Sequence, residues 1–204
     1  GITASEIDYQ QSAVIANVTL EYSHKNTAYE RFTRSRPLAL LPLRDNNCSL
    51  VWTIARDQTA QVMGLDDQAF LTAVQQQFGW RLGRFMQVGK RHAYPLHLIR
   101  TQQHTGPRVV IIGNAAHTLH PIAGQGLNLG LRDVASLAET VVNSLKAGED
   151  VGSEATLQHY VAWQCPDQQR ATSLTNMLVQ VFSNAFPPLV IARNVGLLVT
   201  ETLP

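Results

Sequence analysis

The feature that most constrains the fold is the stretch 109–134, VVIIGNAAHTLHPIAGQGLNLGLRDV, in which three patterns follow one another. Residues 109–112 are apolar and β-branched, which is typical of a short strand buried on both faces. Small residues follow at 113–116 and let another group approach the backbone closely. A pair of glycines, Gly124 and Gly126, comes after Pro121 and leaves the backbone bare in the same way. An apolar ladder then steps by three or four residues, which predicts a helix with one apolar face. Its members are Leu127, Leu131, Val134, Ala138, Val141 and Leu145.

The glycine-rich loop before this helix predicts a place where an electron-rich group can bind. The first N–H groups of a helix have no partner within the helix, and the helix dipole is positive there. The glycines do not fit a dinucleotide fingerprint, because Gly124, Gly126 and Gly130 give G-x-G-x-x-x-G in place of G-x-G-x-x-G. On the glycines alone, a purely structural turn is an equal alternative.

The composition excludes several classes of protein. A chain of 204 residues with 45% apolar residues and a net charge of +1 is neither disordered nor a dedicated nucleic-acid binder, which would carry a basic face. Cys48 and Cys165 fit a reducing compartment and not a disulfide framework. No signal peptide and no membrane-spanning run is visible. We therefore expect a cytoplasmic protein and, because Gly1 is not a methionine, a piece or cleavage product of a longer chain.

The first 104 residues are predicted to form a mainly antiparallel sheet with one helix. Asp66 or Asp67 is expected to cap that helix, which ends near Gly79. The residues expected on its buried face are Phe70, Leu71, Val74 and Phe78. Alternation and turn residues predict the strands. Their ranges are 12–22, 28–33, 38–43, 49–54 and 85–94, the last before Pro95 and extended by 96–103.

The rest of the chain is predicted to be helical. The ladder helix ends at Ala147 and Gly148. Two more helices are expected at 155–165 and 167–186, separated by Pro166, and a fourth runs from Pro187 or Pro188 towards Glu201. The third carries Leu174, Met177, Leu178, Val181 and Phe182 on its apolar side. The fold class is α+β. The predicted segments are a sheet with one helix at 1–104, the strand–loop–helix unit at 105–150 and a helical region at 151–204.

The central stretch resembles the second flavin-binding motif of the aromatic-ring FAD-dependent monooxygenases. The shared pattern is G-N-A-A-H-x-x-x-P-x-x-G-Q-G-x-N-x-G-x-x-D. The residues in this stretch are most similar to those of the ubiquinone-biosynthesis hydroxylase branch (2-polyprenyl-6-methoxyphenol hydroxylase-like). Weaker likenesses lie in YERFTRSRPLALLPL, CSLVW, FGWRLG and the helical tail. The matching positions are Gly113, Asn114, Ala115, Ala116, His117, Pro121, Gly124, Gln125, Gly126, Asn128, Gly130 and Asp133.

The resemblance implies an FAD site and its chemistry. It makes 1–104 a substrate-domain sheet and 105–150 the C-terminal part of an α/β FAD-binding domain. Residue 114 would lie against the ribityl–phosphate region, and the first N–H groups of the ladder helix would point at the N1–O2 edge of the isoalloxazine, where negative charge develops. In this family NAD(P)H reduces FAD, O2 adds to give a flavin hydroperoxide, and a phenol is hydroxylated. No catalytic side chain is assigned. The cofactor-binding residues implied are Gly113, Asn114, Ala115, Ala116, Pro121, Gly124, Gln125, Gly126, Leu127 and Asn128.

Two departures from the family pattern matter. Asn114 stands where the family has an aspartate; its amide can still donate and accept hydrogen bonds but brings no charge. The family's N-terminal G-x-G-x-x-G unit and its later Asp-Gly motif, which grip the ADP half of FAD, are absent from this sequence. The chain is therefore expected to be a C-terminal portion that carries part of a flavin site and is inactive in isolation.

For several residues, a structural role is the simpler alternative to a functional one. His117 and His120 lack the further ligands that a zinc site needs, so we expect no metal, and His117 is expected to brace the loop. No G-x-S-x-G elbow supports a hydrolase. The arginines at 31, 34 and 36 are expected on a solvated strand face, with a contact to substrate or NAD(P)H as the alternative.

Other residues are expected in structural roles. Asp133 is expected to cap or pair within its helix, and Trp52 and Trp80 to lie in the core. The apolar tail is expected to pack inside the protein or against another subunit, with a membrane surface as the alternative. Its members are Leu178, Phe182, Phe186, Leu189, Val190, Leu197 and Leu198.

Two hypotheses of different classes follow. The first is an FAD-dependent monooxygenase that hydroxylates a polyprenyl-phenol in ubiquinone biosynthesis, using NAD(P)H and O2. Its expected partners are that substrate, a peripheral contact at the inner face of the membrane or with a ubiquinone-synthesis complex, and a second copy in a homo-oligomer. No nucleic acid is expected. The second hypothesis is a non-catalytic scaffold or lipid-handling partner that keeps the fold without flavin.

Overall fold

A computed structural model describes residues 3–33 and 36–183, together with 186, 188, 190–192 and 195–196. Arg34, and with it one member of the arginine cluster, lies outside the described residues. So do Leu189, Leu197 and Leu198 of the apolar tail and most of the helix predicted to run from Pro187 or Pro188 to Glu201.

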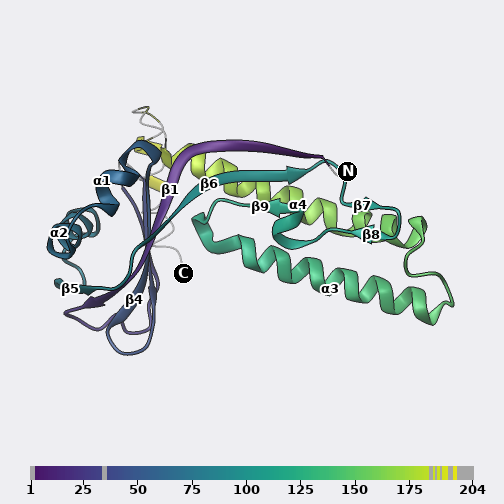
Figure 1. Cartoon of the computed structure of the whole chain (residues 1–204), viewed down its shortest axis with the longest axis horizontal. Coiled ribbons are helices and arrows are strands. Elements are labelled where there is room, and N and C mark those ends of the chain that lie inside the picture. The colour runs from purple at the N-terminus through teal and green to yellow at the C-terminus, as the bar shows by residue number, and fades with distance from the viewer. Residues whose placement is uncertain are drawn as a thin grey trace. The chain divides into compact units, whose positions relative to one another are not determined.

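The chain mixes helices with a mainly antiparallel sheet, which confirms the predicted α+β class (Figure 1). In the described part of the chain, seven strands form one sheet and two form a hairpin. The sheet strands are β1 (Ala4–Leu20), β2 (Tyr29–Phe32), β3 (Pro37–Pro42), β4 (Asn47–Ala55), β5 (Phe85–Val88), β6 (His92–Thr101) and β9 (His117–Thr118); the hairpin is β7 (Thr105–Gly106) and β8 (Val109–Val110). The helices are α1 (Thr59–Met63), α2 (Asp67–Phe78), α3 (Gln125–Lys146) and α4 (Glu154–Ser183), with short 3-10 turns η1 (Arg56–Gln58), η2 (Gly113–Ala115) and η3 (Ile122–Gly124).

The chain divides into two compact units. Unit 1 comprises residues 1–9 and 97–180, and unit 2 comprises 10–96 and 181–204. The long strands β1 and β6 each contribute residues to both units. The three segments predicted at 1–104, 105–150 and 151–204 stay a prediction.

Unit 2 is built on antiparallel pairs in the order β2-β3-β4-β1. Strand β4 lies between β3 and β1, with Trp52 opposite Leu38 on one side and Val14 on the other. The predicted turn at 44–47 joins β3 to β4, and Asp45 takes the left-handed conformation (φ 59°) that Asp tolerates in turns. The predicted antiparallel hairpins are therefore confirmed.

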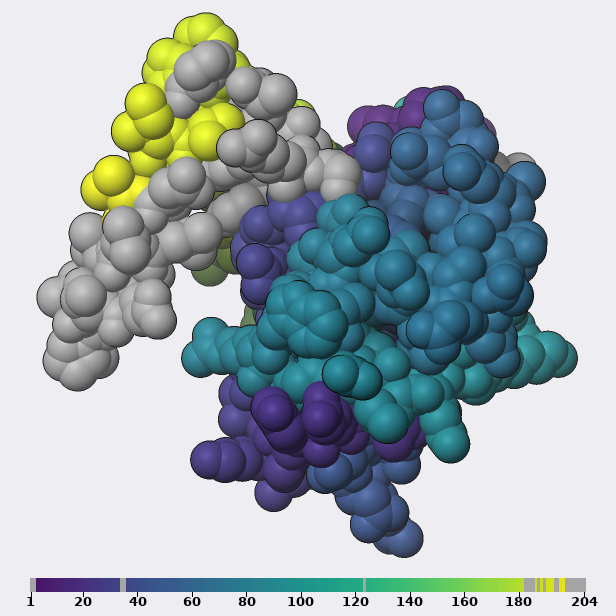
Figure 2. Space-filling model, turned by 90° about the vertical axis from the view of Figure 1, so that its left-hand side faces the viewer, coloured from purple at the N-terminus to yellow at the C-terminus, as the bar shows by residue number. Residues whose placement is uncertain are grey.

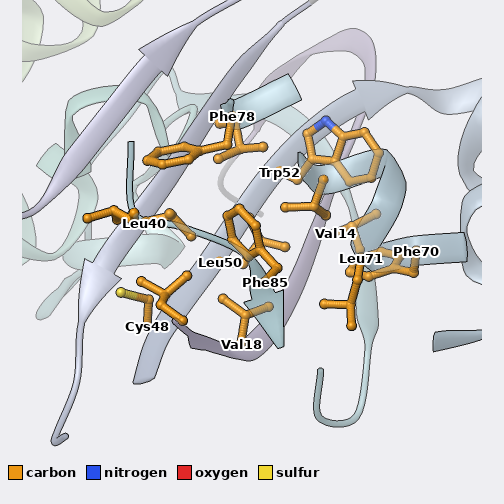
Figure 3. Close-up of a cluster of buried hydrophobic side chains, with 14 of the residues drawn as sticks. Val14, Val18, Leu40, Cys48, Leu50, Trp52, Phe70, Leu71, Phe78 and Phe85 are labelled. Atoms are coloured by element: carbon orange, nitrogen blue, oxygen red, sulfur yellow. The ribbon is translucent and has the colours of Figure 1, made fainter. Parts of the chain in front are cut away.

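Helix α2 covers one face of this sheet and closes the core of unit 2. Asp66 caps it, accepting a hydrogen bond from the N–H of Ala69 at 2.7 Å, and Gly79 ends it with φ 88°. Trp52 packs edge-on against Phe70, with ring centroids 5.9 Å apart (Figure 3). The predicted cap, end and buried face are all confirmed. The buried residues of α2 are Phe70, Leu71, Val74 and Phe78.

Two expectations in unit 2 need correction. The strand predicted over 85–94 is two strands, β5 and β6. Pro95 lies inside β6, which continues over most of the predicted extension at 96–103. Trp80 is 68% exposed and not in the core, since the turn after Gly79 carries it off the helix. Figure 2 shows the face of unit 2 formed by α1 and α2 (blue) and the segment containing β5 (teal).

Arg31 is exposed on β2, as predicted for a solvated strand face, and it also makes a contact within unit 2. Its guanidinium donates a hydrogen bond to the carbonyl of Phe78, at the end of α2. A cation at the last carbonyls of a helix is stabilised by the helix dipole. Arg31 is thus part of the structure of unit 2.

In unit 1 the long helices α3 and α4 lie side by side (Figure 1). Helix α3 ends as predicted, with Ala147 as the C-cap and Gly148 at φ 71°. The break predicted at Pro166 is wrong, because α4 runs unbroken through it. Leu174 and Met177, predicted on the buried side, are 53% exposed, whereas Thr172 and Thr175 are buried.

Candidate functional site

The predicted cofactor-binding residues lie on one continuous segment of unit 1. Gly113, Asn114 and Ala115 form η2, and Pro121 precedes η3, which leads directly into the first turn of α3. Gly124 is the N-cap of α3, and its φ of 59° is in the left-handed region that favours glycine. The predicted order of loop, glycine and helix start is therefore present. The residues of the first turn are Gln125, Gly126, Leu127 and Asn128.

The loop and the helix start are open to an approaching group. A Cβ built on Gly113, Gly124 or Gly126 would meet no other atom within 4 Å. The N-cap residue of α3 is Gly124, which has no side chain to cap the first N–H groups of the helix. The side chains of Asn114 and Asn128 are exposed, and Leu127 is 75% exposed. An uncapped helix start beside bare backbone favours an electron-rich ligand.

Ala116 is the exception among the predicted residues, because it is buried. It lines a cavity of about 980 Å³ in unit 1, together with Arg100, His104 and His117. Burial and the neighbouring His117 lower the pKa of His104. None of the other predicted cofactor-binding residues lines this cavity, which is therefore distinct from the open loop.

The role predicted for Asp133 is corrected by its contacts. Its side chain is buried and pairs outside its own helix, with the loop residues Gly113 and His117 and with two glutamines of α4. The bracing role predicted for His117 is confirmed by its bond to Asp133. Sequence reasoning missed Gln164 and Gln168, since no local pattern marks a contact between two helices.

One expectation based on the apolar residues of 109–145 is wrong. Val109 is 51% exposed, and β8 is a two-residue strand paired with β7, so 109–112 is not buried on both faces. The predicted helix with one apolar face is present as α3. Its apolar ladder faces outward, and the opposite, largely polar face packs on α4. We call this ladder the α3 stripe. Its exposed members are Leu127, Leu131, Val134, Ala138 and Leu145, with Val142 beside them.

Among the described residues, no group of three or more His, Cys, Asp or Glu side chains is arranged to hold a metal ion. His120 is buried, and burial lowers its pKa to about 4. Within the described part of the chain, no helix combines the length and apolar character needed to span a membrane.

Residues 4–173 match the FAD-binding domain family. The chain belongs to this family. It is 38% identical over 203 residues to the ubiquinone hydroxylase UbiL of Rhodospirillum rubrum, an alignment that covers 100% of this chain and 47% of that protein. It is 34% identical to the 3-demethoxyubiquinol 3-hydroxylase of Escherichia coli, covering 98% of this chain and 51% of that one. The chain thus spans about half the length of these relatives.

The fold is similar to that of solved flavoproteins. The crystal structure of PqsL from P. aeruginosa, in complex with 2-aminobenzoylacetate, matches with a TM-score of 0.75 at 19% identity. The match covers 90% of this chain and 51% of PqsL. As with the sequence relatives, the solved chain extends well beyond the part that this chain matches.

Proposed function

We propose that the protein containing this chain is an FAD-dependent monooxygenase that hydroxylates the aromatic ring of a polyprenyl-phenol in ubiquinone biosynthesis. The observation that carries the proposal is the open, glycine-lined start of α3, in a chain whose relatives include named ubiquinone hydroxylases. FAD, with NAD(P)H and O2, would supply the redox chemistry. No catalytic side chain is assigned.

The residues present fit FAD. Gly113, Gly124 and Gly126 leave space that a side chain would fill, so a flat ring and a phosphate-bearing chain can approach the backbone. The first N–H groups of α3 would hold the N1–O2 edge of the isoalloxazine and stabilise negative charge there. Asn114 would donate or accept a hydrogen bond at the ribityl chain.

The α3 stripe supports the view that this chain carries only part of the FAD domain. Exposed apolar rows of this kind mark a surface that another element covers. The relatives are about twice as long as this chain. We assign the stripe to contact with the nucleotide-binding half, which would grip the ADP part of FAD. The sheet of unit 2 would form the substrate side. A peripheral membrane contact, a ubiquinone-synthesis complex and a homo-oligomer stay predictions.

The first test is a visible absorption spectrum and a hydroxylation assay on the complete protein encoded by the reading frame that contains this chain. We expect bound FAD and NAD(P)H-dependent hydroxylation of a polyprenyl-phenol. Gly126→Val should abolish both while the protein stays folded, because a Cβ at this position has no other part of the chain within 4 Å, and the valine would occupy the space beside the helix start.

Gly89→Val is the matched control. A Cβ at Gly89 would make an ordinary contact of 3.6 Å with the carbonyl oxygen of Asn17, far in sequence from the loop. This variant should keep its flavin. A folded, colourless protein that ignores added FAD would refute the enzyme and support the scaffold. A Gly126→Val protein with unchanged flavin content and activity would refute the role given to the start of α3.

A further inference from the structure

One buried carboxylate, that of Asp133, joins three segments around the open loop. Asp133 is 0% exposed. Its Oδ2 accepts hydrogen bonds from the backbone N–H of Gly113 at 2.8 Å and from Nε2 of His117 at 2.7 Å. Its Oδ1 accepts from the Nε2 atoms of Gln164 at 2.7 Å and Gln168 at 3.0 Å. The carboxylate therefore ties both ends of 113–117 to α3, and α3 to α4.

The carboxylate of Asp133 is kept charged. Burial alone would raise its pKa, but hydrogen bonds from His117, Gln168 and Gly113 lower the pKa to about 2. Hydrogen bonds to an ionised acceptor are shorter and stronger than those between neutral groups. Removing the carboxylate would leave these buried donors without an acceptor. A buried donor without a partner costs more free energy than a hydrogen bond contributes when it is made.

Asp133 lies on the same helix as the backbone groups expected to face the isoalloxazine. It follows Gly126 by about two helical turns. A Cβ on Gly130, between them, would lie 3.6 Å from the Cα of Gly113, so the loop packs directly on the first turns of α3. A single rigid helix therefore sets the distance between the loop and the helix start.

We propose that Asp133 is a positioning residue for FAD. Its carboxylate holds the loop 113–117 against α3, so that Asn114 and the helix start face the two ends of one flavin–ribityl unit. The inference rests on the proposed function, because it concerns the loop expected to meet FAD. The hydrogen bonds of Asp133 are to protein groups, in the loop and on α4.

The test compares three variants of the complete protein. Asp133→Ala removes all four bonds. Asp133→Asn keeps one oxygen for the loop, while Gln164 and Gln168 can turn their amides to accept from its NH2. Gln75→Leu, whose contacts all lie in unit 2, is the control for lost stability without any change at the loop.

Two quantities are measured: the Kd for FAD, by titration of the apoprotein, and hydrogen exchange of the segment 109–118 without FAD. We expect Asp133→Ala to raise the Kd about tenfold or more and to speed exchange in this segment. Asp133→Asn should raise the Kd by a smaller factor, about threefold. Gln75→Leu should leave both quantities unchanged.

The outcomes separate this inference from the proposed function. Wild-type protein that binds no FAD would overturn both. Wild-type protein that binds FAD, with Asp133→Ala within twofold of its Kd, would overturn only the role of Asp133. If Asp133→Ala is recovered unfolded, Asp133→Asn decides, and unchanged exchange and Kd in that variant would overturn the role. If Gln75→Leu speeds hydrogen exchange in 109–118 as much as Asp133→Ala does, the role of Asp133 would also be overturned.

Discussion

His120 makes the stability of this protein depend on pH through burial and not through an ion pair. Its Nδ1 accepts a hydrogen bond from the N–H of Ile122 at 3.1 Å, and its ring packs edge-on against Tyr9, with centroids 5.3 Å apart. Burial lowers its pKa from 6.5 to about 4. The neutral ring is therefore the native form, and protonation favours the unfolded chain.

The predicted pH dependence follows from this sign. Between pH 6.5 and about 4 the unfolded chain binds a proton at His120 and the folded chain does not, so the free energy of unfolding falls as the pH falls. Over this whole pH range the free energy of unfolding falls by about 3 kcal/mol through His120. His120→Asn keeps an acceptor for Ile122 but cannot titrate. Urea unfolding at pH 7 and pH 4.5 should give a loss about 2 kcal/mol smaller in the variant, and equal losses would contradict the prediction.

At the scale of elements, a single side chain ties the end of α2 to β5. Gln75 donates from Nε2 to the carbonyls of Gly79 (2.7 Å) and Gly83 (3.1 Å), and its Oε1 accepts from the N–H of Phe85 (3.0 Å). Gln75→Leu removes all three bonds, and we expect a loss of about 1–3 kcal/mol of unfolding free energy. Gln76→Leu, exposed on the same helix, should change it by less than about 0.5 kcal/mol. Chemical denaturation measures both, and similar losses would contradict this role.

The elements that sequence predicted best are those whose signals are local. In α2 the cap at Asp66, the spacing of the buried residues and Gly79 all lie within the element, so its limits and its buried face could be read directly. The antiparallel strands of unit 2 were predictable for the same reason. At the candidate site, the order of small-residue turn, glycine and helix start was also local.

The failures have non-local causes. Pro166 normally ends a helix, but α4 continues through it where Gln164 and Gln168 bond to Asp133 on α3. Residues 109–112 carry the pattern of a strand buried on both faces, yet β8 contains only two of them and Val109 is 51% exposed. Whether such an apolar run is buried depends on which elements pack against it, and no local pattern records that. The hydrogen bonds of Asp133 could not be predicted from the sequence, because its partners lie on a loop and on a second helix, α4.

At the scale of the whole molecule, the stripe predicts how the complete protein is held together. Leu131 is 58% exposed in this chain, so Leu131→Glu breaks no buried contact within it. In the complete protein the glutamate would be buried against the nucleotide-binding half at a cost of about 2 kcal/mol or more. We expect lower flavin content and a lower unfolding temperature, measured by absorbance and calorimetry.

Asn143→Glu is the control for this prediction, since Asn143 is exposed on α3 but off the stripe. It should leave flavin content and unfolding temperature close to those of the wild type. If Leu131→Glu behaves like Asn143→Glu, the stripe is not the surface that meets the other half.

Unit 1 is built from two segments that lie far apart in the sequence, 1–9 and 97–180, and this has a consequence for its synthesis on the ribosome. Residues 3–9 are made well before their partners in the second segment: the carbonyl of Thr3 accepts from the N–H of Gln102 at 3.1 Å, and Ser5 donates to the carbonyl of Arg100 at 3.2 Å, 95 residues away. Closing so long a loop costs chain entropy before any contact forms. Residues 10–96 of unit 2 are contiguous and can fold while the ribosome is still translating. Residues 3–9 therefore reach these partners only after the segment that follows residue 96 has been made.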